Sequence, residues 1–367
     1  MLITINKDLE ENIAQICATG TIAALRGLTN LLQSQADQRH LVAIPQNICR
    51  ILEDCARLSE EQRGVAKKIR ARYPELAQLK NILPTYATVV AIGEHPFKEG
   101  GFWRLPLNWI AKNGLSETHL VREDLYDCDI CQEAARDYLN AASLPQLMLR
   151  FDQTPGGGGN THRVLLNKAV EGQRICICLV DSDRSNPSSG LGQTAENCSM
   201  IKGEGLYEVC MTPGREIENH IPVKIIDKIR SDWEGATPSQ SYTRFNQNNQ
   251  QILLFADLKK GLKHKEIIEM SGAQQAFWAA ACMDLGKEQR TCCAELCTAQ
   301  NHGDCRHSII APLNRTLLRE TRDYLTQHAT NPKRHRDYLP SQNDSFWKIM
   351  GGLVAAYGVT VKMTASI

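Results

Sequence analysis

The stretch Arg174-Ile-Cys-Ile-Cys-Leu-Val-Asp181-Ser-Asp183-Arg184 is an unbroken apolar run that ends in two aspartates one residue apart. A run of aliphatic residues without polar alternation is typical of a strand that is buried on both faces of a parallel sheet. Open α/β sheets bind their ligands beyond the carboxyl ends of such strands. The sequence therefore predicts a site at Asp181 and Asp183, and the alternative is an ordinary polar loop after a core strand.

The region around this strand alternates short apolar segments with helical ones, which is the pattern of a parallel α/β sheet. We predict strands at residues 118–122, 145–151, 174–180 and 206–211. We predict helices at residues 124–142, after the glycines up to residue 170, and from Arg215 onward. The expected fold class is α/β, with a central parallel sheet flanked by helices.

Two mainly helical regions are expected on either side of this sheet. Residues 1–115 show apolar residues at three- and four-residue steps between residues 8 and 80, a capped helix start at Ser59-Glu-Glu-Gln62, and one strand at residues 85–93. Residues 263–367 contain further helical patterns at 265–285 and 313–328. The predicted organisation is thus a helical region at 1–115, a catalytic domain at 116–262 and a helical region at 263–367.

The composition limits the class of protein. Lysine plus arginine (42) nearly equals aspartate plus glutamate (41) among 367 residues, so any surface that attracts a polyanion must be local. The start of the chain does not resemble a secretory signal, and no apolar segment reaches the roughly 18 residues that span a bilayer. We therefore expect a cytoplasmic protein without membrane contact, whose fourteen cysteines act mainly as reduced, buried thiols.

Acidic residues follow two of the predicted strands. Glu123 ends the strand at residues 118–122, and Asp181 and Asp183 follow the strand at residues 174–180. Because the carboxyl ends of parallel strands gather at one edge of the sheet, we expect these three carboxylates to meet. Hard oxygen ligands of this kind suit Mg²⁺ or Mn²⁺, which promote hydrolysis of phosphodiester bonds.

A glycine run lies between these strands. Gly156, Gly157, Gly158 and Gly159 follow the strand predicted at 145–151 and precede a helix, so their amides and the helix N-terminus could bind a phosphate. The run is not a Walker motif, because no Gly-Lys-Ser/Thr sequence follows it. The alternative is a flexible turn.

The order of these motifs resembles the Toprim domain of topoisomerases, primases and the OLD (overcoming lysogenisation defect) nucleases. The resemblance covers residues 117–262 and rests on six short features. They are Glu123, Asp127, the glycine turn, Asp181-x-Asp183, the stretch Arg215-Glu216-Ile-Glu218-Asn219, and Asp257-Leu-Lys259. Asp124 stands where the family usually has a glycine, and this departure adds a carboxylate beside Glu123.

The resemblance implies a Mg²⁺-dependent endonuclease, a hydrolase of DNA or RNA, that serves as a toxic effector of bacterial anti-phage defence. Its implied catalytic residues are Glu123, Asp127, Asp181, Asp183, Glu216, Glu218 and Lys259. Asp181 and Asp183 would bind the metal, and Glu123 would be either a further metal ligand or the general base. Glu216 or Glu218 would complete a second metal position, and Lys259 would stabilise the phosphate.

These assignments have alternatives. Glu216 and Glu218 could be first-turn glutamates favoured by the helix dipole, and Lys259 could belong to a solvated basic face. The whole chain could also be a non-catalytic protein that binds nucleic acid or a partner, or a nucleotide-hydrolysing or phosphotransfer α/β enzyme. The chain lacks the Walker motifs of full-length OLD proteins, so we expect a nuclease subunit that acts with a separate ATPase or sensor protein.

The last third of the chain carries a dense group of soft metal ligands. Its members are Cys292, Cys293, Cys297, His302, Cys305 and His307. These residues either hold a structural Zn²⁺ or act as core thiols and surface histidines, because their spacing matches no standard zinc pattern. The apolar tail at residues 346–357 is suited to pack on a core or against a partner subunit in an oligomer.

Overall fold

The computed structural model describes residues 1–201, 205–231, 250–286, 308–310, 312–313, 315–331, 333–338 and 345–361. The chain divides into two compact units. The first comprises Met1–Cys178, Ile201–Val209 and Lys348–Ile367, and the second comprises Leu179–Met200 and Cys210–Trp347. The units interleave along the chain, whereas the three predicted regions are consecutive, so the predicted domain boundaries stay a prediction.

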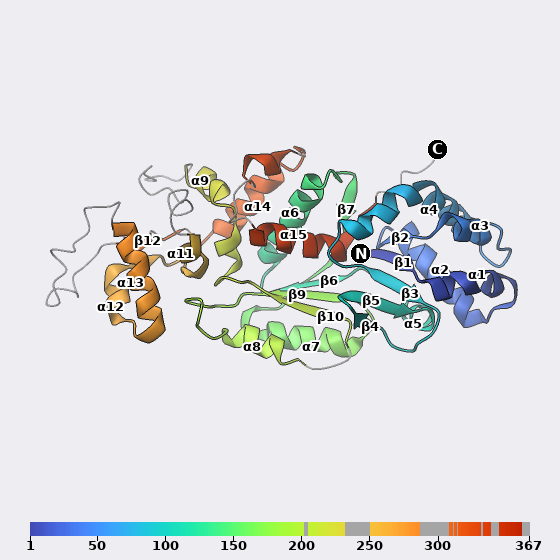
Figure 1. Ribbon diagram of the computed structural model, residues 1–367, viewed down its shortest axis with the longest axis horizontal. Coiled ribbons are helices and arrows are strands. Elements are labelled where there is room, and N and C mark those ends of the chain that lie inside the picture. The colour runs from blue at the N-terminus through green and yellow to red at the C-terminus, as the bar shows by residue number, and fades with distance from the viewer. Residues whose placement is uncertain are drawn as a thin grey trace. The chain divides into compact units, whose positions relative to one another are not determined.

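The first unit begins with a five-stranded sheet in the order β2-β1-β3-β5-β4. Its strands are β1 (Leu2–Ile5), β2 (Leu41–Ala43), β3 (Ala87–Val90), β4 (Phe97–Glu99) and β5 (Phe102–Pro106). They run parallel except for β4, which is antiparallel to β5. The helices of this region are α1 (Lys7–Thr19), α2 (Ile22–Ala36), α3 (Gln46–Glu53), α4 (Glu60–Gln78), the 3₁₀ helix η1 (Leu79–Asn81) and α5 (Leu107–Asn113) (Figure 1).

This sheet adds strands to a region in which the sequence predicts mainly helices. The helices expected between residues 8 and 80 are present, and the expected strand at 85–93 is β3. Ser59 caps α4 as predicted: its hydroxyl accepts from the Gln62 amide at 3.2 Å, and Gln62 accepts from the Ser59 amide at 3.0 Å. The unpredicted strands β1 and β2 are four and three residues long, too short for a periodic signal.

A second sheet has the order β10-β9-β6-β8, and all of its strands run parallel. These strands are β6 (His119–Arg122), β8 (Asp152–Pro155), β9 (Cys176–Val180) and β10 (Tyr207–Met211). Helix α6 (Leu125–Ala141) lies on one face of β6, and α7 (Thr161–Glu171) lies on the other (Figure 1). The predicted α/β class with a parallel sheet is therefore confirmed, as are three of the four predicted strands.

The strand predicted at 145–151 is present, but its predicted place in this sheet was wrong. The apolar segment predicted at 145–151 forms β7 (Leu147–Leu149), which pairs antiparallel with β13 (Val359–Val361) instead of joining β6. The partner of β6 is β8, whose register pairs His119 with Asp152. Strand β8 reads Asp-Gln-Thr-Pro and lies at a partly exposed sheet edge, so it lacks the apolar pattern on which the prediction relied.

The apolar tail forms α15 (Ser345–Gly358), and its residues in the first unit pack on α6 as part of the core, which is one of the two alternatives that the sequence leaves open. Gly351 lies against the backbone of Ala134, where an added Cβ would stand 2.3 Å from the Ala134 carbonyl oxygen. At the end of α15 the buried Tyr357 hydroxyl accepts from Trp103 Nε1 at 2.8 Å and donates to Glu208. The tail is thus fixed at several points along its length.

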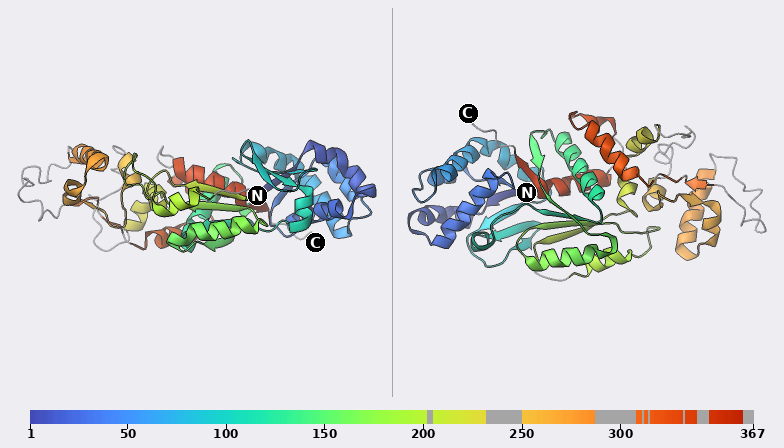
Figure 2. Two further views of the ribbon diagram at one scale, coloured as in Figure 1. Left: turned by 90° about the horizontal axis from the view of Figure 1, so that it is seen from below. Right: turned by 180° about the vertical axis from the view of Figure 1, so that it is seen from behind.

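The second unit consists mainly of short helices. Its elements are α8 (Gln193–Ser199), η3 (Ile217–His220), α9 (Val223–Ser231), α11 (Gln250–Phe255), β11 (Leu262–Lys263), α12 (His264–Glu269), α13 (Gly272–Gly286), β12 (Ser308–Ile310), α14 (Leu317–Gln327) and the 3₁₀ helix η6 (Arg334–Asp337). The 3₁₀ helix η2 (Gly158–Asn160) belongs to the first unit. Helices α12 and α13, coloured orange, pack against each other (Figure 2).

The helices predicted at 265–285 and 313–328 are confirmed by α12, α13 and α14. The helix predicted to begin at Arg215 begins later and in two parts: the chain first forms the four-residue 3₁₀ helix η3, and α9 begins only at Val223. Pro222 separates the two elements, and proline commonly opens a new helix because it lacks an amide hydrogen.

Two further predictions concern cysteines and membranes. Nine cysteines whose side chains the structure describes are free thiols, most of them buried, in keeping with the predicted reduced state. Among the helices that the structure describes, none is both long enough and apolar enough to cross a bilayer.

Replacing Gly351 with alanine tests the packing of α15 on α6. Because the new Cβ meets backbone rather than a flexible side chain, we expect the free energy of unfolding to fall by about 1–3 kcal/mol. Gly64→Ala is the matched control, since Gly64 lies within α4 with nothing within 4 Å of the added Cβ, and it should stabilise by about 0.5–1 kcal/mol. Urea unfolding followed by circular dichroism measures both changes, and equal effects would contradict the packing.

The buried His40 makes the first unit sensitive to acid. Its Nε2 lies 2.8 Å from the Ser116 carbonyl oxygen, and burial holds the pKa of His40 well below its ordinary value of 6.5. Below pH 6.5 the imidazole of His40 binds a proton in the unfolded chain but stays neutral in the folded chain. This one group therefore lowers the free energy of unfolding by at most about 1.4 kcal/mol for each unit by which the pH falls. His40→Gln should flatten this dependence between pH 6.5 and 5; an unchanged slope would refute the assignment.

Candidate active site of clustered carboxylates

Strand β9 delivers Asp181 into the interior of the second unit. All five residues of β9 are buried, and Asp181 follows directly with 9% of its surface exposed. Asp181 Oδ1 accepts a hydrogen bond from the Ile217 amide at 3.0 Å, which orients the carboxylate toward η3. The predicted end of the apolar run is therefore a fixed carboxylate and not a solvated loop.

Asp183 adopts a backbone conformation that few non-glycine residues take. Its φ is 55°, in the left-handed region, and its amide donates to the Arg215 carbonyl at 2.8 Å. Gly192 approaches so closely that an added Cβ would lie 2.4 Å from Asp183 Oδ2 and 2.5 Å from Asp183 Cβ. Backbone strain of this kind is typical of functional sites, and Gly192 leaves the room that Asp183 needs.

The stretch from Arg215 to Asn219 forms a tight turn tied to the end of α11. The Arg215 amide donates to the Leu254 carbonyl at 2.7 Å, and Asn219 Nδ2 donates to the carbonyls of Leu253 at 2.6 Å and Ala256 at 2.8 Å. The Glu216 amide in turn donates to Asn219 Oδ1 at 2.8 Å. These bonds place the turn beside the segment that carries Asp257 and Lys259.

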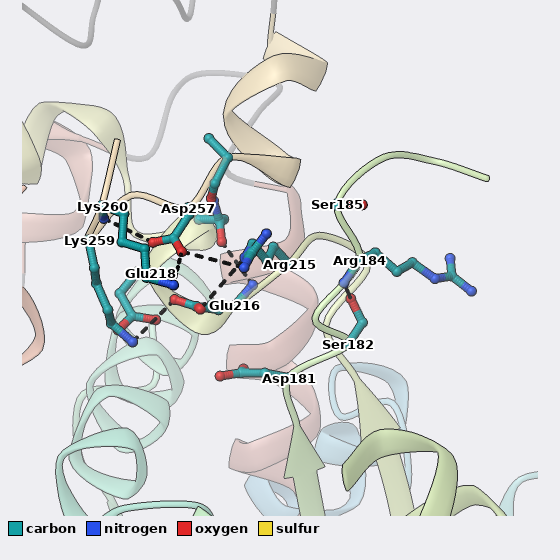
Figure 3. Close-up of polar contacts among 12 residues, drawn as sticks. Asp181, Ser182, Arg184, Ser185, Arg215, Glu216, Glu218, Asp257, Lys259 and Lys260 are labelled. Atoms are coloured by element: carbon teal, nitrogen blue, oxygen red, sulfur yellow. Dashed lines mark hydrogen bonds and ion pairs between the residues drawn. The ribbon is translucent and has the colours of Figure 1, made fainter. Parts of the chain in front are cut away.

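Lys259 lies between the two glutamates of this turn (Figure 3). Its Nζ is 2.7 Å from Glu218 Oε1 and 3.2 Å from Glu216 Oε2. Glu218 is only 1% exposed, and in the described part of the chain its Oε2 has no hydrogen-bond partner. The structure thus brings together Glu216, Glu218 and Lys259, which the sequence grouped only through the family resemblance.

The electrostatics of the cluster follow from burial and like charge. Burial, with added repulsion from Asp181 and Glu216, raises the pKa of Glu218 to about 7 even though Lys259 opposes the shift. Burial and the neighbouring Asp181 also raise the pKa of Asp183. Burial disfavours the charged form of Lys259, but the two glutamates outweigh it and raise the pKa of this lysine. The cluster therefore holds more negative charge than it readily accommodates.

Arg215 and Asp257 border the cluster, and the sequence predicts no contact between them. Arg215 Nη2 lies 3.4 Å from Asp257 Oδ2, and Arg215 Nε lies 3.8 Å from Glu216 Oε1. Burial alone would raise the pKa of Asp257, but the hydrogen bond from the Lys260 amide and the charge of Arg215 lower it. Both residues stand within motifs that the sequence singled out, yet only the folded chain shows the ion pair.

Glu123 and Asp127 lie in the first unit, after β6. Asp127 is 5% exposed, accepts from the Asp124 amide at 3.2 Å and forms an ion pair with Arg122 at 3.5 Å. Asp124 caps α6 by accepting from the Tyr126 amide at 2.7 Å, which gives this departure from the family pattern a structural role. The predicted joining of Glu123 with Asp181, a residue of the other unit, stays a prediction.

The glycine turn holds the backbone around Glu123. The Gly156 amide donates to the Arg122 carbonyl at 2.5 Å, and the Gly157 amide donates to the Glu123 carbonyl at 3.0 Å. These two amides are therefore engaged within the protein, which differs from the predicted phosphate contact of all four glycines. Gly158 and Gly159 precede α7, where the first amides of a helix have no intrahelical acceptor, so a phosphate contact stays a prediction for them.

The cluster of the second unit fits a divalent metal ion by its chemistry. Asp181, Asp183, Glu216 and Glu218 supply only hard oxygen atoms, and Glu218 contributes a buried oxygen without a hydrogen-bond partner among the described residues. In this arrangement, however, no three His, Cys, Asp or Glu side chains of the described ranges are placed to hold one ion. The proposed zinc ligands at residues 292–307 lie outside the described residues.

Comparison with protein-family models, with curated proteins and with solved structures finds no match to this chain. The Toprim resemblance therefore rests on the motifs and their order, and the candidate site rests on the contacts of its own residues.

A double-mutant cycle tests the fit between Gly192 and Asp183. Gly192→Ala should lower the free energy of unfolding by about 1–3 kcal/mol, because the added methyl group overlaps Asp183. Asp183→Gly removes the overlapping atoms and relieves the positive φ, so it should be neutral or stabilising by itself and should cancel most of the cost of Gly192→Ala. Urea unfolding gives the coupling energy; strictly additive effects would show that Gly192 does not act through Asp183.

Proposed function

We propose that this chain is a metal-dependent nuclease that hydrolyses phosphodiester bonds of DNA or RNA. The observation that carries the proposal is the buried carboxylate Glu218, which shares Lys259 with Glu216 beyond the carboxyl end of β9. Buried ionisable groups of opposite sign with displaced pKa values are characteristic of catalytic sites. A role in anti-phage defence, with a separate ATPase or sensor protein as partner, is a further part of the proposal that rests on the family resemblance.

In this proposal, carboxylates of the second unit hold the metal ion. Asp181 and Asp183 provide one set of oxygen ligands, and Glu216 or Glu218 provides another. When bound, such an ion lowers the pKa of water and stabilises negative charge that develops on a phosphoryl oxygen. Lys259 stabilises the negative charge of the phosphate, as expected for an ammonium group at the edge of the cluster with 39% of its side chain exposed.

Glu123 is proposed as a further ligand or as the general base. In the order β10-β9-β6-β8, the chain adds β8 on one side of β6 and then β9 on the other side. This change of side is a topological switch point, and ligands of open α/β sheets bind at such points. Glu123 follows β6, as Asp181 follows β9. The glycine turn supports this role because its amides fix the backbone carbonyls of Arg122 and Glu123.

A cleavage assay with Mg²⁺, Mn²⁺ or EDTA tests the function, with single- and double-stranded DNA, tRNA and other RNA as substrates. We expect cleavage only with metal, and a loss of at least about 100-fold in Asp181→Asn and Glu218→Gln, because each removes a charged ligand. Glu196→Gln is the matched control, since Glu196 is an exposed carboxylate on α8 of the same unit. Glu123→Gln should be as inactive as Asp181→Asn if Glu123 belongs to the site.

The outcomes of this assay separate the alternatives. Cleavage of every polynucleotide that is equal in EDTA and in Mg²⁺ would contradict the metal-dependent mechanism. Hydrolysis of mononucleotides but of no polynucleotide would favour a nucleotide-hydrolysing enzyme. Binding of nucleic acid without cleavage under any condition would favour a non-catalytic protein.

A further inference from the structure

Lys259 occupies the place where a metal ion would be expected in the carboxylate cluster. Its ammonium group lies within 3.2 Å of oxygen atoms from both Glu216 and Glu218. Figure 3 shows its side chain reaching the two glutamates from the segment that follows α11. A divalent cation at the same pair of oxygen atoms would take the same role, which is to neutralise two neighbouring carboxylates.

The surrounding charges leave Glu218 dependent on Lys259. Arg215 is paired with Asp257 and lies 3.8 Å from Glu216, and the ammonium group of Lys260 lies 3.4 Å from Asp257. Glu218 is only 1% exposed, and its Oε2 has no hydrogen-bond partner in the described ranges. A buried carboxylate of this kind needs a cation nearby, because desolvating an unpaired charge is costly.

A divalent cation and an ammonium group on the same oxygen atoms repel each other. A Mg²⁺ or Mn²⁺ ion binds carboxylate oxygen at about 2.1 Å, so an ion on Glu218 Oε1 would repel an ammonium group that lies 2.7 Å from the same atom. The side chain of Lys259 is 39% exposed and flexible, whereas that of Glu218 is 1% exposed. The lysine is therefore the group that can leave, and the glutamate is the group that stays.

We propose that Lys259 and a divalent cation compete for Glu216 and Glu218, so that binding of the metal expels the lysine ammonium from the cluster. This inference rests on the proposed function, because it takes the cluster to be a metal site. It explains why no three carboxylates of the described residues are placed around one ion position. In this state the two glutamates are arranged around the ammonium group of Lys259 instead.

The exchange would link metal binding to substrate binding. With the metal absent, the ammonium group is held by two glutamates and is unavailable to an anion. Once expelled, it carries its positive charge to the edge of the cluster, where a backbone phosphate of the nucleic acid would meet it. Lys259 thus acts first as a stand-in for the metal and then as a phosphate ligand.

Isothermal titration with Mn²⁺ alone tests the exchange on the intact chain. Lys259→Met removes the competing cation, so we expect it to bind Mn²⁺ at least tenfold more tightly than the wild type. Lys260→Met is the matched control, because Lys260 is the neighbouring lysine and pairs with Asp257 instead of the glutamates; its affinity should equal that of the wild type. Lys259→Gln, which keeps a hydrogen-bond donor for Glu218, should also bind more tightly and serves if Lys259→Met does not fold.

Each outcome bears on the proposal. Equal or weaker Mn²⁺ binding by folded Lys259→Met or Lys259→Gln would overturn the exchange. If the wild type nevertheless binds Mn²⁺ and Glu218→Gln does not, the proposed function would still stand. Tighter binding by Lys260→Met to the same degree would also overturn it, because the effect would then be one of general charge. Absence of Mn²⁺ binding in the wild type and in both Lys259 variants would overturn the metal site itself.

Discussion

The burial of Glu218 is the constraint on which the candidate site depends. A carboxylate that is 1% exposed is stable in its charged form only beside a cation, and Lys259 provides one at 2.7 Å. The same burial raises the pKa of Glu218 to about 7, and the neighbouring Lys259 opposes this shift by stabilising the charged carboxylate. A group held in this way is ready to accept a stronger cation, which is why the proposed metal site and the lysine contact belong to one account.

Hydrogen bonds with a main-chain donor or acceptor assemble the site from segments that lie far apart in the sequence. The carboxylate of Asp181, which follows β9, accepts a hydrogen bond from the Ile217 amide. The Arg215 amide donates to the Leu254 carbonyl, and the Asn219 side chain donates to the Leu253 carbonyl in α11. Each of these bonds ties one segment to the main chain of another. The carboxylates are therefore held near one another despite their mutual repulsion, as preorganised catalytic groups must be.

Parts of the fold with a strong local signal could be predicted from the sequence, and parts that depend on distant contacts could not. Strand β9 and its terminal aspartate follow from an unbroken apolar run. Strand β8 could not be found, because an exposed edge strand carries no apolar pattern, and its apolar neighbour β7 pairs with β13 far along the chain. The ion pair of Arg215 with Asp257 and the contact of Lys259 with Glu218 join residues about 40 positions apart, which periodicity does not encode.

The most direct test of the account is a crystal structure of the chain soaked in Mn²⁺, with anomalous scattering used to locate the ion. The account predicts an anomalous peak coordinated by Glu218 and at least one of Asp181, Asp183 and Glu216, with the ammonium group of Lys259 moved away from the glutamates. A map without a peak at these carboxylates, in which Lys259 still contacts Glu216 and Glu218, would contradict it.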